Sequence, residues 1–89
     1  VLSKRRMVTI FCYLNDLPDD NAGGETTFPH IGQEGGVKVR PKAGRAVIFS
    51  NVKLSMGGDY LVPDERTVHE GLPVLKGIKY GLNIWICEE

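Results

Sequence analysis

Turn-forming residues divide this chain into short stretches that have the composition of β-strands. Glycine, proline, asparagine and aspartate gather between stretches rich in β-branched, aromatic and aliphatic residues. No stretch shows the period of an amphipathic helix. Six strands are expected, at 7–14, 25–29, 37–40, 45–51, around His69, and at 79–87. The pattern predicts an all-β antiparallel sandwich or barrel of the jelly-roll kind.

The segments between these strands are predicted to be loops. The stretches 15–24, 30–36 and 53–64 are polar and contain glycine, so each is expected to lack regular structure. Loops of this kind carry most of the specificity of a binding site that is built on a rigid β scaffold.

Length and charge exclude several classes of function. The chain has 89 residues and no formal net charge, with 11 basic and 11 acidic residues. This balance gives no electrostatic basis for binding nucleic acid. No apolar run is long enough to cross a membrane. Cys12 and Cys87 both lie in expected strands, where free thiols are commoner than a disulfide, although a pairing stays open.

The strand at 7–14 is apolar on both faces. Alternation places Thr9, Phe11 and Tyr13 on one face and residues such as Ile10 on the other. Such a strand expects cover on both sides, and no other part of the chain is predicted to supply the second cover. We therefore expect the chain to be a piece of a longer protein, with strands and a covering layer missing on its N-terminal side.

The stretch 66–88 has the most distinctive arrangement of polar residues. It places His69 ten residues before Lys79, with Gly71, Pro73 and Gly77 between them, and this spacing predicts a hairpin with a metal-ligand residue on one strand and a cation on the next. In the second strand, period 2 puts five residues on the face of the cation and leaves an apolar wall opposite. These five are Lys79, Gly81, Asn83, Trp85 and Cys87, and Gly81 is expected to leave room for a ligand to approach.

Several motifs in this order resemble the prolyl 4-hydroxylase group of iron(II) and 2-oxoglutarate dependent dioxygenases. They are YLND, GGETTFP, VRPKAGRAVIFSN, TVHEGLPV and GIKYGLNIW, and they cover nearly the whole chain. The resemblance implies a double-stranded β-helix, which is a jelly roll. It implies that residues 1–89 form the C-terminal portion of the catalytic domain, truncated at the N-terminal side.

The resemblance also implies roles for individual residues. His69 resembles the distal histidine of a two-histidine, one-carboxylate iron site, which leaves coordination positions open. Lys79 resembles the cation that pairs with the far carboxylate of 2-oxoglutarate, and Tyr13 resembles a tyrosine that assists there. A buried lysine would otherwise be costly, and a dianion supplies its partner. Three further residues match positions of the pocket lining, which are Asn83, Trp85 and, more weakly, Thr27.

Plainer readings of these residues stay open. Tyr13 is also compatible with a core tyrosine whose hydroxyl is satisfied, and Trp85 with simple packing. The pair of iron ligands that the family carries as His-x-Asp does not occur, because His30 is followed by Ile31 and Gly32. The chain is therefore expected to hold one of three metal ligands, His69.

The expected function is part of a dioxygenase that converts 2-oxoglutarate to succinate and hydroxylates peptidyl proline. The resemblance implies iron(II) and 2-oxoglutarate, with L-ascorbate as a further cofactor, and it permits a location in the endoplasmic reticulum. Two alternatives remain. The first is a dioxygenase of the same fold that acts on another residue or a small molecule, and the second is a metal-free jelly-roll binding module. Oligomeric state is not indicated.

Overall fold

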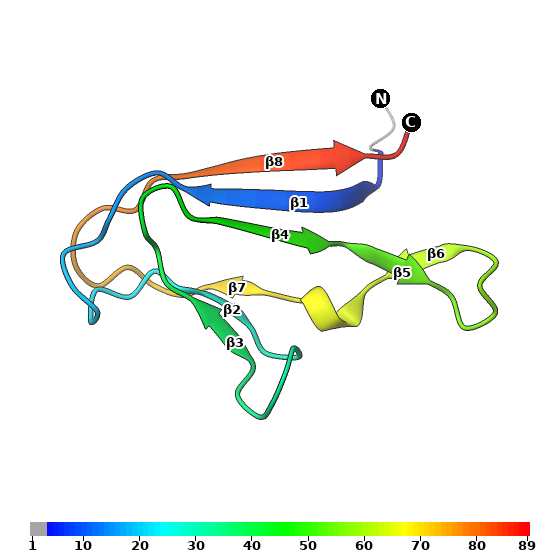
Figure 1. The fold of residues 1–89 in the computed structure, drawn as a ribbon, viewed down its shortest axis with the longest axis horizontal. Coiled ribbons are helices and arrows are strands. Elements are labelled where there is room, and N and C mark those ends of the chain that lie inside the picture. Colours follow the sequence, from blue (N-terminus) through cyan, green and yellow to red (C-terminus); the bar gives the residue numbers. More distant parts are fainter. Residues whose placement is uncertain (1–3) are drawn as a thin grey trace.

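The computed structural model describes residues 4–89, and this part of the chain is all-β (Figure 1). It contains no α-helix within that range, in agreement with the sequence. The strands are β1 (Arg6–Tyr13), β2 (Thr26–Phe28), β3 (Val37–Val39), β4 (Ala46–Ser50), β5 (Val52–Leu54), β6 (Leu61–Pro63), β7 (Glu70–Gly71) and β8 (Gly81–Cys87), and one short 3₁₀ helix, η1, spans Glu65–Thr67.

The strands form two antiparallel sheets and a hairpin. The larger sheet has the order β4-β1-β8 and the smaller one the order β3-β2-β7, while β5 pairs with β6. Figure 1 shows the two sheets as separate layers joined by loops at one end, with the β5–β6 hairpin extending from the other. This arrangement agrees with the predicted jelly roll.

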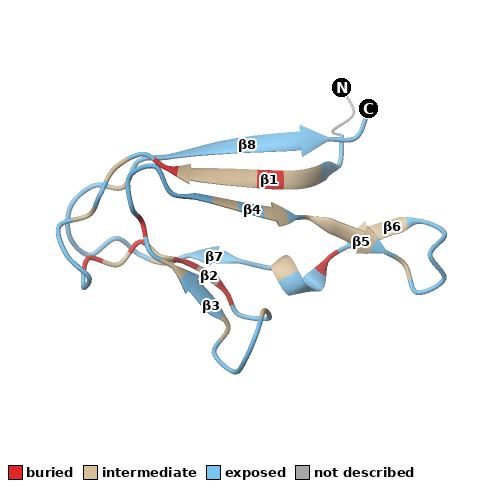
Figure 2. Cartoon of the chain, in the orientation of Figure 1, coloured by how far each residue is buried: buried red, intermediate tan, exposed pale blue. Residues whose placement is uncertain are grey.

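The register of the larger sheet gives it two different faces. Thr9 lies opposite Phe49 on β4 and Trp85 on β8, so the odd-numbered residues of the three strands share one face. This inner face is turned toward the smaller sheet. The outer face is apolar and lacks cover within residues 4–89, since Ile48 on β4 is 67% exposed and β8 is exposed along its length (Figure 2).

The buried core is small and lies where the two sheets meet. Tyr13, Ala22 and Phe28 are the buried apolar residues of the described chain. The rings of Phe28 on β2 and Phe49 on β4 meet edge to face, with centroids 5.2 Å apart. The Tyr13 hydroxyl lies 2.6 Å from Thr26 Oγ1. These contacts fix the distance between the sheets and so the space between them.

The predicted hairpin between His69 and Lys79 is wrong. β7 pairs with β2, and β8 pairs with β1, so the two segments belong to different sheets. The intervening segment 72–80 is long enough to cross from one sheet to the other. It is held on the way by backbone hydrogen bonds to the loop 15–24, for example from Leu75 N–H to Ala22 O at 2.7 Å.

The segment 53–64 is also more regular than predicted. β5 and β6 form an antiparallel hairpin, and Ser55 N–H donates to Tyr60 O at 2.8 Å across its tip. Each strand has three residues, too few for alternation to stand out against the polar turn between them.

The cysteines are free thiols at opposite ends of the β1–β8 ladder. Cys12 is paired with Leu82 and Cys87 with Arg6, so the two side chains cannot reach each other. Across residues 4–89, none of the helical structure has the length and hydrophobicity needed to span a bilayer.

Candidate functional site

One pocket lies between the two sheets and is lined from both of them. Its volume is about 210 Å³, which suits a small ligand. β1, β4 and β8 supply one wall, and β2, β7 and the residue before β7 supply the other. The lining residues are Thr9, Phe11, Thr26, Val47, Phe49, His69, Gly71, Lys79 and Asn83. His69 and Lys79 therefore share one pocket although the predicted hairpin does not exist.

His69 sits immediately before β7, with its ring beside two aromatic rings. The centroids lie 4.8 Å from Phe49 and 5.5 Å from Phe28. Its Nδ1 lies 2.9 Å from the carbonyl oxygen of Thr67. Because a carbonyl can only accept, Nδ1 must carry the proton and donate it. In the neutral ring this leaves the lone pair on Nε2, and that tautomer is the one that can bind a metal ion through Nε2.

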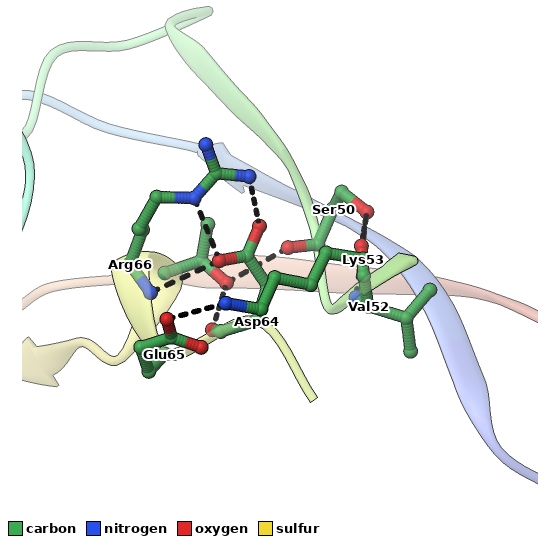
Figure 3. Close-up of polar contacts among 7 residues, drawn as sticks. Ser50, Val52, Lys53, Asp64, Glu65 and Arg66 are labelled. Carbon is green, nitrogen blue, oxygen red and sulfur yellow. Dashed lines mark hydrogen bonds and ion pairs between the residues drawn. The ribbon is translucent and has the colours of Figure 1, made fainter. Parts of the chain in front are cut away.

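The turn that leads to His69 is held by an ion pair (Figure 3). Asp64 caps η1 by accepting from Arg66 N–H at 3.0 Å, and the Arg66 guanidinium donates to both carboxylate oxygens of Asp64 at 2.9 and 2.8 Å. These hydrogen bonds lower the pKa of Asp64 to about 2. Thr67 Oγ1 donates to Ser50 O at 2.8 Å, which ties the turn to β4.

Lys79 approaches the pocket from the larger sheet, just before β8. Its Nζ lies 5.4 Å from the ring centroids of Phe11 and Tyr13, within the range of a cation–π contact. No carboxylate within residues 4–89 forms an ion pair with it. Burial lowers the pKa of the ammonium, and the more distant charge of Glu25 opposes this. A partly desolvated cation without an ion-pair partner among the described residues is chemically suited to bind an anion.

Tyr13 stands behind the pocket wall. Its side chain is fully buried and its hydroxyl shares the 2.6 Å hydrogen bond with Thr26, with a longer contact of 3.4 Å to Val39 O. Thr26 lines the pocket and Tyr13 does not. The hydroxyl is thus linked to the pocket through Thr26.

The remaining candidates divide between the pocket and its surroundings. Asn83 lines the pocket, as predicted. Trp85 lies on the same face but two residues farther along β8, outside the lining, where the Arg6 guanidinium stacks 3.8 Å from its ring centroid. Thr27 is also outside the lining, because β2 turns its neighbours Thr26 and Phe28 inward.

Several lining residues were not predicted from the sequence, although the alternation of the strand at 7–14 had grouped two of them on one face. Thr9 and Phe11 were placed on the face of Tyr13 by alternation, without being assigned to the site. The space beside Gly81 was expected to admit a ligand. In the structure the Phe11 ring fills it, and a Cβ at Gly81 would lie 2.3 Å from that ring.

The comparison with known families agrees with this geometry. The family model of the 2OG-Fe(II) oxygenase superfamily matches residues 2–87. The chain belongs to this superfamily. A 2OG-Fe(II) oxygenase is named for 2-oxoglutarate and iron(II), and the pocket described above contains a histidine and a lysine that forms no ion pair within residues 4–89.

Among curated relatives of this superfamily, prolyl 4-hydroxylases are similar to the chain. It is 41% identical over 76 residues to the prolyl 4-hydroxylase subunit alpha-2 of Gallus gallus, covering 85% of this chain and 12% of that protein. It is 39% identical over 83 residues to the human prolyl 4-hydroxylase subunit alpha-1, covering 93% of this chain and 13% of that protein. The chain is 29% identical to prolyl 4-hydroxylase 2 of Arabidopsis thaliana, covering 91% of the chain and 30% of that protein.

The residues of the pocket fit 2-oxoglutarate and iron(II) to different degrees. The unpaired, partly desolvated Lys79 suits a carboxylate of 2-oxoglutarate. For iron, the pocket offers the imidazole of His69, with Nε2 available. Within residues 4–89, no three His, Cys, Asp or Glu side chains gather closely enough to hold a metal ion. Among the described residues that line the pocket, His69 is therefore the single candidate iron ligand.

Proposed function

We propose that this chain contributes the 2-oxoglutarate pocket and one iron ligand to a dioxygenase that hydroxylates peptidyl proline. The observation that carries the proposal is the shared pocket, in which His69, just before β7, and Lys79, just before β8, line a single space. An imidazole that can bind a metal and an ammonium that can bind an anion lie at one pocket. This pair suits a ligand that carries a carboxylate and also reaches the metal.

In this proposal Lys79 binds the far carboxylate of 2-oxoglutarate. The ammonium is partly buried and has no carboxylate partner among the described residues, so binding a dianion recovers the free energy lost on desolvation. Tyr13 assists by holding Thr26 at the pocket wall, and Asn83 offers its amide from β8. Thr27 and Trp85 lie outside the lining and are proposed only as surrounding residues.

His69 is proposed to bind iron(II) through Nε2. The hydrogen bond from Nδ1 to Thr67 O fixes the tautomer, and Phe28 and Phe49 restrict the ring. When bound, iron and 2-oxoglutarate would supply the oxidation, with dioxygen as the oxidant: one oxygen atom would enter the succinate formed as carbon dioxide leaves, and the other would become the hydroxyl group of the substrate. The residues of this chain hold these groups in place and keep the apolar part of the pocket dry.

The relatives support the proposed substrate and the further cofactor. All the curated relatives described above are prolyl 4-hydroxylases, which supports peptidyl proline as the substrate. L-ascorbate is proposed as a further cofactor by the same resemblance. The chain spans only 12 to 30% of the length of these relatives, so the experiment uses the full-length protein.

The test is the affinity for 2-oxoglutarate of full-length protein carrying Lys79→Ala. Truncating one partner of a desolvated charge pair costs about 2 to 5 kcal/mol, so the KM for 2-oxoglutarate should rise by one to several orders of magnitude. Lys76→Ala is the matched control. Lys76 lies on the same connecting segment 72–80 as Lys79, but it forms its ion pair with Asp19 in the loop 15–24. An unchanged KM in Lys79→Ala would remove this lysine from the site.

A further inference from the structure

We propose that Asn15 is a positioning residue for Lys79, holding the backbone on both sides of that lysine so that its ammonium stays at the pocket. This inference rests on the proposed role of Lys79 in binding 2-oxoglutarate. Asn15 belongs to the YLND segment and immediately follows Leu14, at the end of β1.

Two hydrogen bonds carry the inference. Asn15 Nδ2 donates to Ile78 O at 2.6 Å, and Asn15 Oδ1 accepts from Tyr80 N–H at 2.8 Å. The two backbone groups flank Lys79, one residue before it and one after it. A side-chain amide has a donor and an acceptor on one rigid plane, so it can satisfy both groups at once, whereas a carboxylate or a hydroxyl cannot bind them in the same way.

Other parts of the chain give this segment little support. Lys79 precedes β8, and the side chains of Ile78 and Tyr80 are both largely exposed, so neither anchors the backbone by burial. One backbone hydrogen bond, from Leu14 N–H to Tyr80 O at 3.0 Å, joins the same two segments. The Asn15 amide therefore provides two of the three hydrogen bonds that hold residues 78–80 to the end of β1.

Fixing the backbone matters because of the side chain that it carries. Lysine is a point charge on a flexible stem with four carbons, and it has no planar fork to orient it. The stem passes close to Gly24 in the loop 15–24, since a Cβ built on Gly24 would lie 3.4 Å from Lys79 Cδ, an ordinary van der Waals distance. With the backbone held beside this loop, less conformational freedom remains to be lost when an anion binds.

The neighbouring Asp16 offers a matched control. Its Oδ1 accepts from Ala43 N–H at 2.9 Å, so Asp16 makes a side-chain to backbone hydrogen bond that supports the turn before β4 and not residues 78–80. Asp16→Ala should therefore lose a comparable contact in the same loop without moving Lys79.

The experiment measures 2-oxoglutarate binding to the full-length protein by calorimetry, with Zn²⁺ as a redox-inert metal in place of iron. Asn15→Ala should weaken binding roughly five- to tenfold, the factor expected for a hydrogen bond, while Asp16→Ala leaves it unchanged. If Asn15 acts through Lys79, the double variant Asn15→Ala/Lys79→Ala binds no more weakly than Lys79→Ala alone. Hydrogen exchange at the Tyr80 amide should rise roughly five- to tenfold in Asn15→Ala.

The outcomes separate this inference from the proposed function. Lys79→Ala without effect on binding would overturn both. A large effect of Lys79→Ala, with the Asn15 effect multiplying onto it in the double variant, would overturn the inference and leave the proposed function standing. If Asn15→Ala does not fold, Asn15→Asp replaces it in the cycle, because it keeps the acceptor for Tyr80 N–H and loses the donor to Ile78 O. Unchanged binding in Asn15→Asp would also contradict the inference.

Discussion

The two faces of the β4-β1-β8 sheet come from the same strands and yet differ in their polar groups and in their exposure. The inner face presents the hydroxyl of Thr9, the amide of Asn83 and the rings of Phe11 and Phe49 to the pocket. The outer face is aliphatic and exposed, with Ile48 and Ile84 among its members. Neighbouring residues on one strand, such as Asn83 and Ile84, are therefore expected to affect different properties, ligand binding for one and association for the other.

His69→Ala, opposite the inner face, should have the largest effect. We expect turnover in the full-length protein to be abolished and iron binding to be weakened, because an open iron site with two histidines and one carboxylate loses a ligand. The fold should change little, since His69 is exposed and its ring contacts only the rings of Phe28 and Phe49 among the aromatic side chains described. Succinate release and thermal unfolding check the two halves of this prediction. Loss of the fold together with turnover in the folded remainder would disprove the ligand assignment.

Residues 1–89 produced alone should self-associate. β4 and β8 are the outer strands of their sheet, and the outer face bears exposed Ile48, Leu82, Ile84 and Ile86. Sedimentation should show dimers or larger species, and Ile84→Asp should shift them toward monomer more than Asn83→Asp does. We also expect no iron-dependent release of succinate, because His69 is the only potential metal ligand among the lining residues described. A monodisperse monomer that releases succinate would contradict both expectations.

The affinity for 2-oxoglutarate should depend on pH through Lys79. Burial lowers the pKa of the free ammonium below its ordinary value of 10.5, whereas a bound carboxylate favours the charged form. The affinity for 2-oxoglutarate is therefore constant below the pKa that Lys79 has in the free protein, and it falls above that pKa by up to about tenfold per pH unit. Titration of the full-length protein at several alkaline pH values measures this, and the fall should disappear in Lys79→Ala. The same fall in Lys79→Ala would assign it to another group.

Tyr13→Phe should have a smaller effect, of a few-fold on the 2-oxoglutarate affinity. The substitution removes the hydroxyl that bonds Thr26 and keeps the ring that packs against Phe11, whose centroid lies 5.0 Å away. A lost hydrogen bond to a pocket residue is worth roughly 1 kcal/mol. Equilibrium binding with Zn²⁺ gives the number. An unchanged affinity with lowered stability would make Tyr13 a core residue only.

Asp64→Asn touches neither face and should have the smallest effect. The pKa of Asp64 is lowered from 3.8 to about 2, so its contribution to stability is present above pH 3.8 and is lost as the pH falls toward 2. Over that interval the unfolding temperature of the wild-type protein should decrease more than that of Asp64→Asn. Equal decreases would show that the ion pair with Arg66 adds nothing to folding.

The faces of the large sheet could be predicted from the sequence because β1 and β8 are long enough for alternation to repeat. Period 2 grouped Thr9 and Phe11 with Tyr13, and Asn83 with Lys79, and the structure turns both of these faces toward the pocket. β2 has only three residues, so alternation could not decide between Thr26 and Thr27, and the structure turns Thr26 inward.

Strand partners were harder to predict than strand faces. The spacing of His69 and Lys79 is compatible with a hairpin as well as with a crossing between sheets, and only the contacts of the segment 72–80 with the loop 15–24 distinguish the two. The β5–β6 hairpin was missed because its strands are short. The role proposed for Asn15 depends on which backbone groups its amide reaches, and such contacts have no counterpart in a local pattern.

The placement of His69 and Lys79 around one ligand is tested most directly by a crystal structure of the full-length protein with Zn²⁺ and 2-oxoglutarate. The expected result is His69 Nε2 at about 2.0 to 2.1 Å from the metal and Lys79 Nζ at about 2.7 to 2.9 Å from an oxygen of the far carboxylate of the same 2-oxoglutarate molecule. A ligand bound at the metal with its far carboxylate held by another residue, or a metal bound without His69, would contradict it.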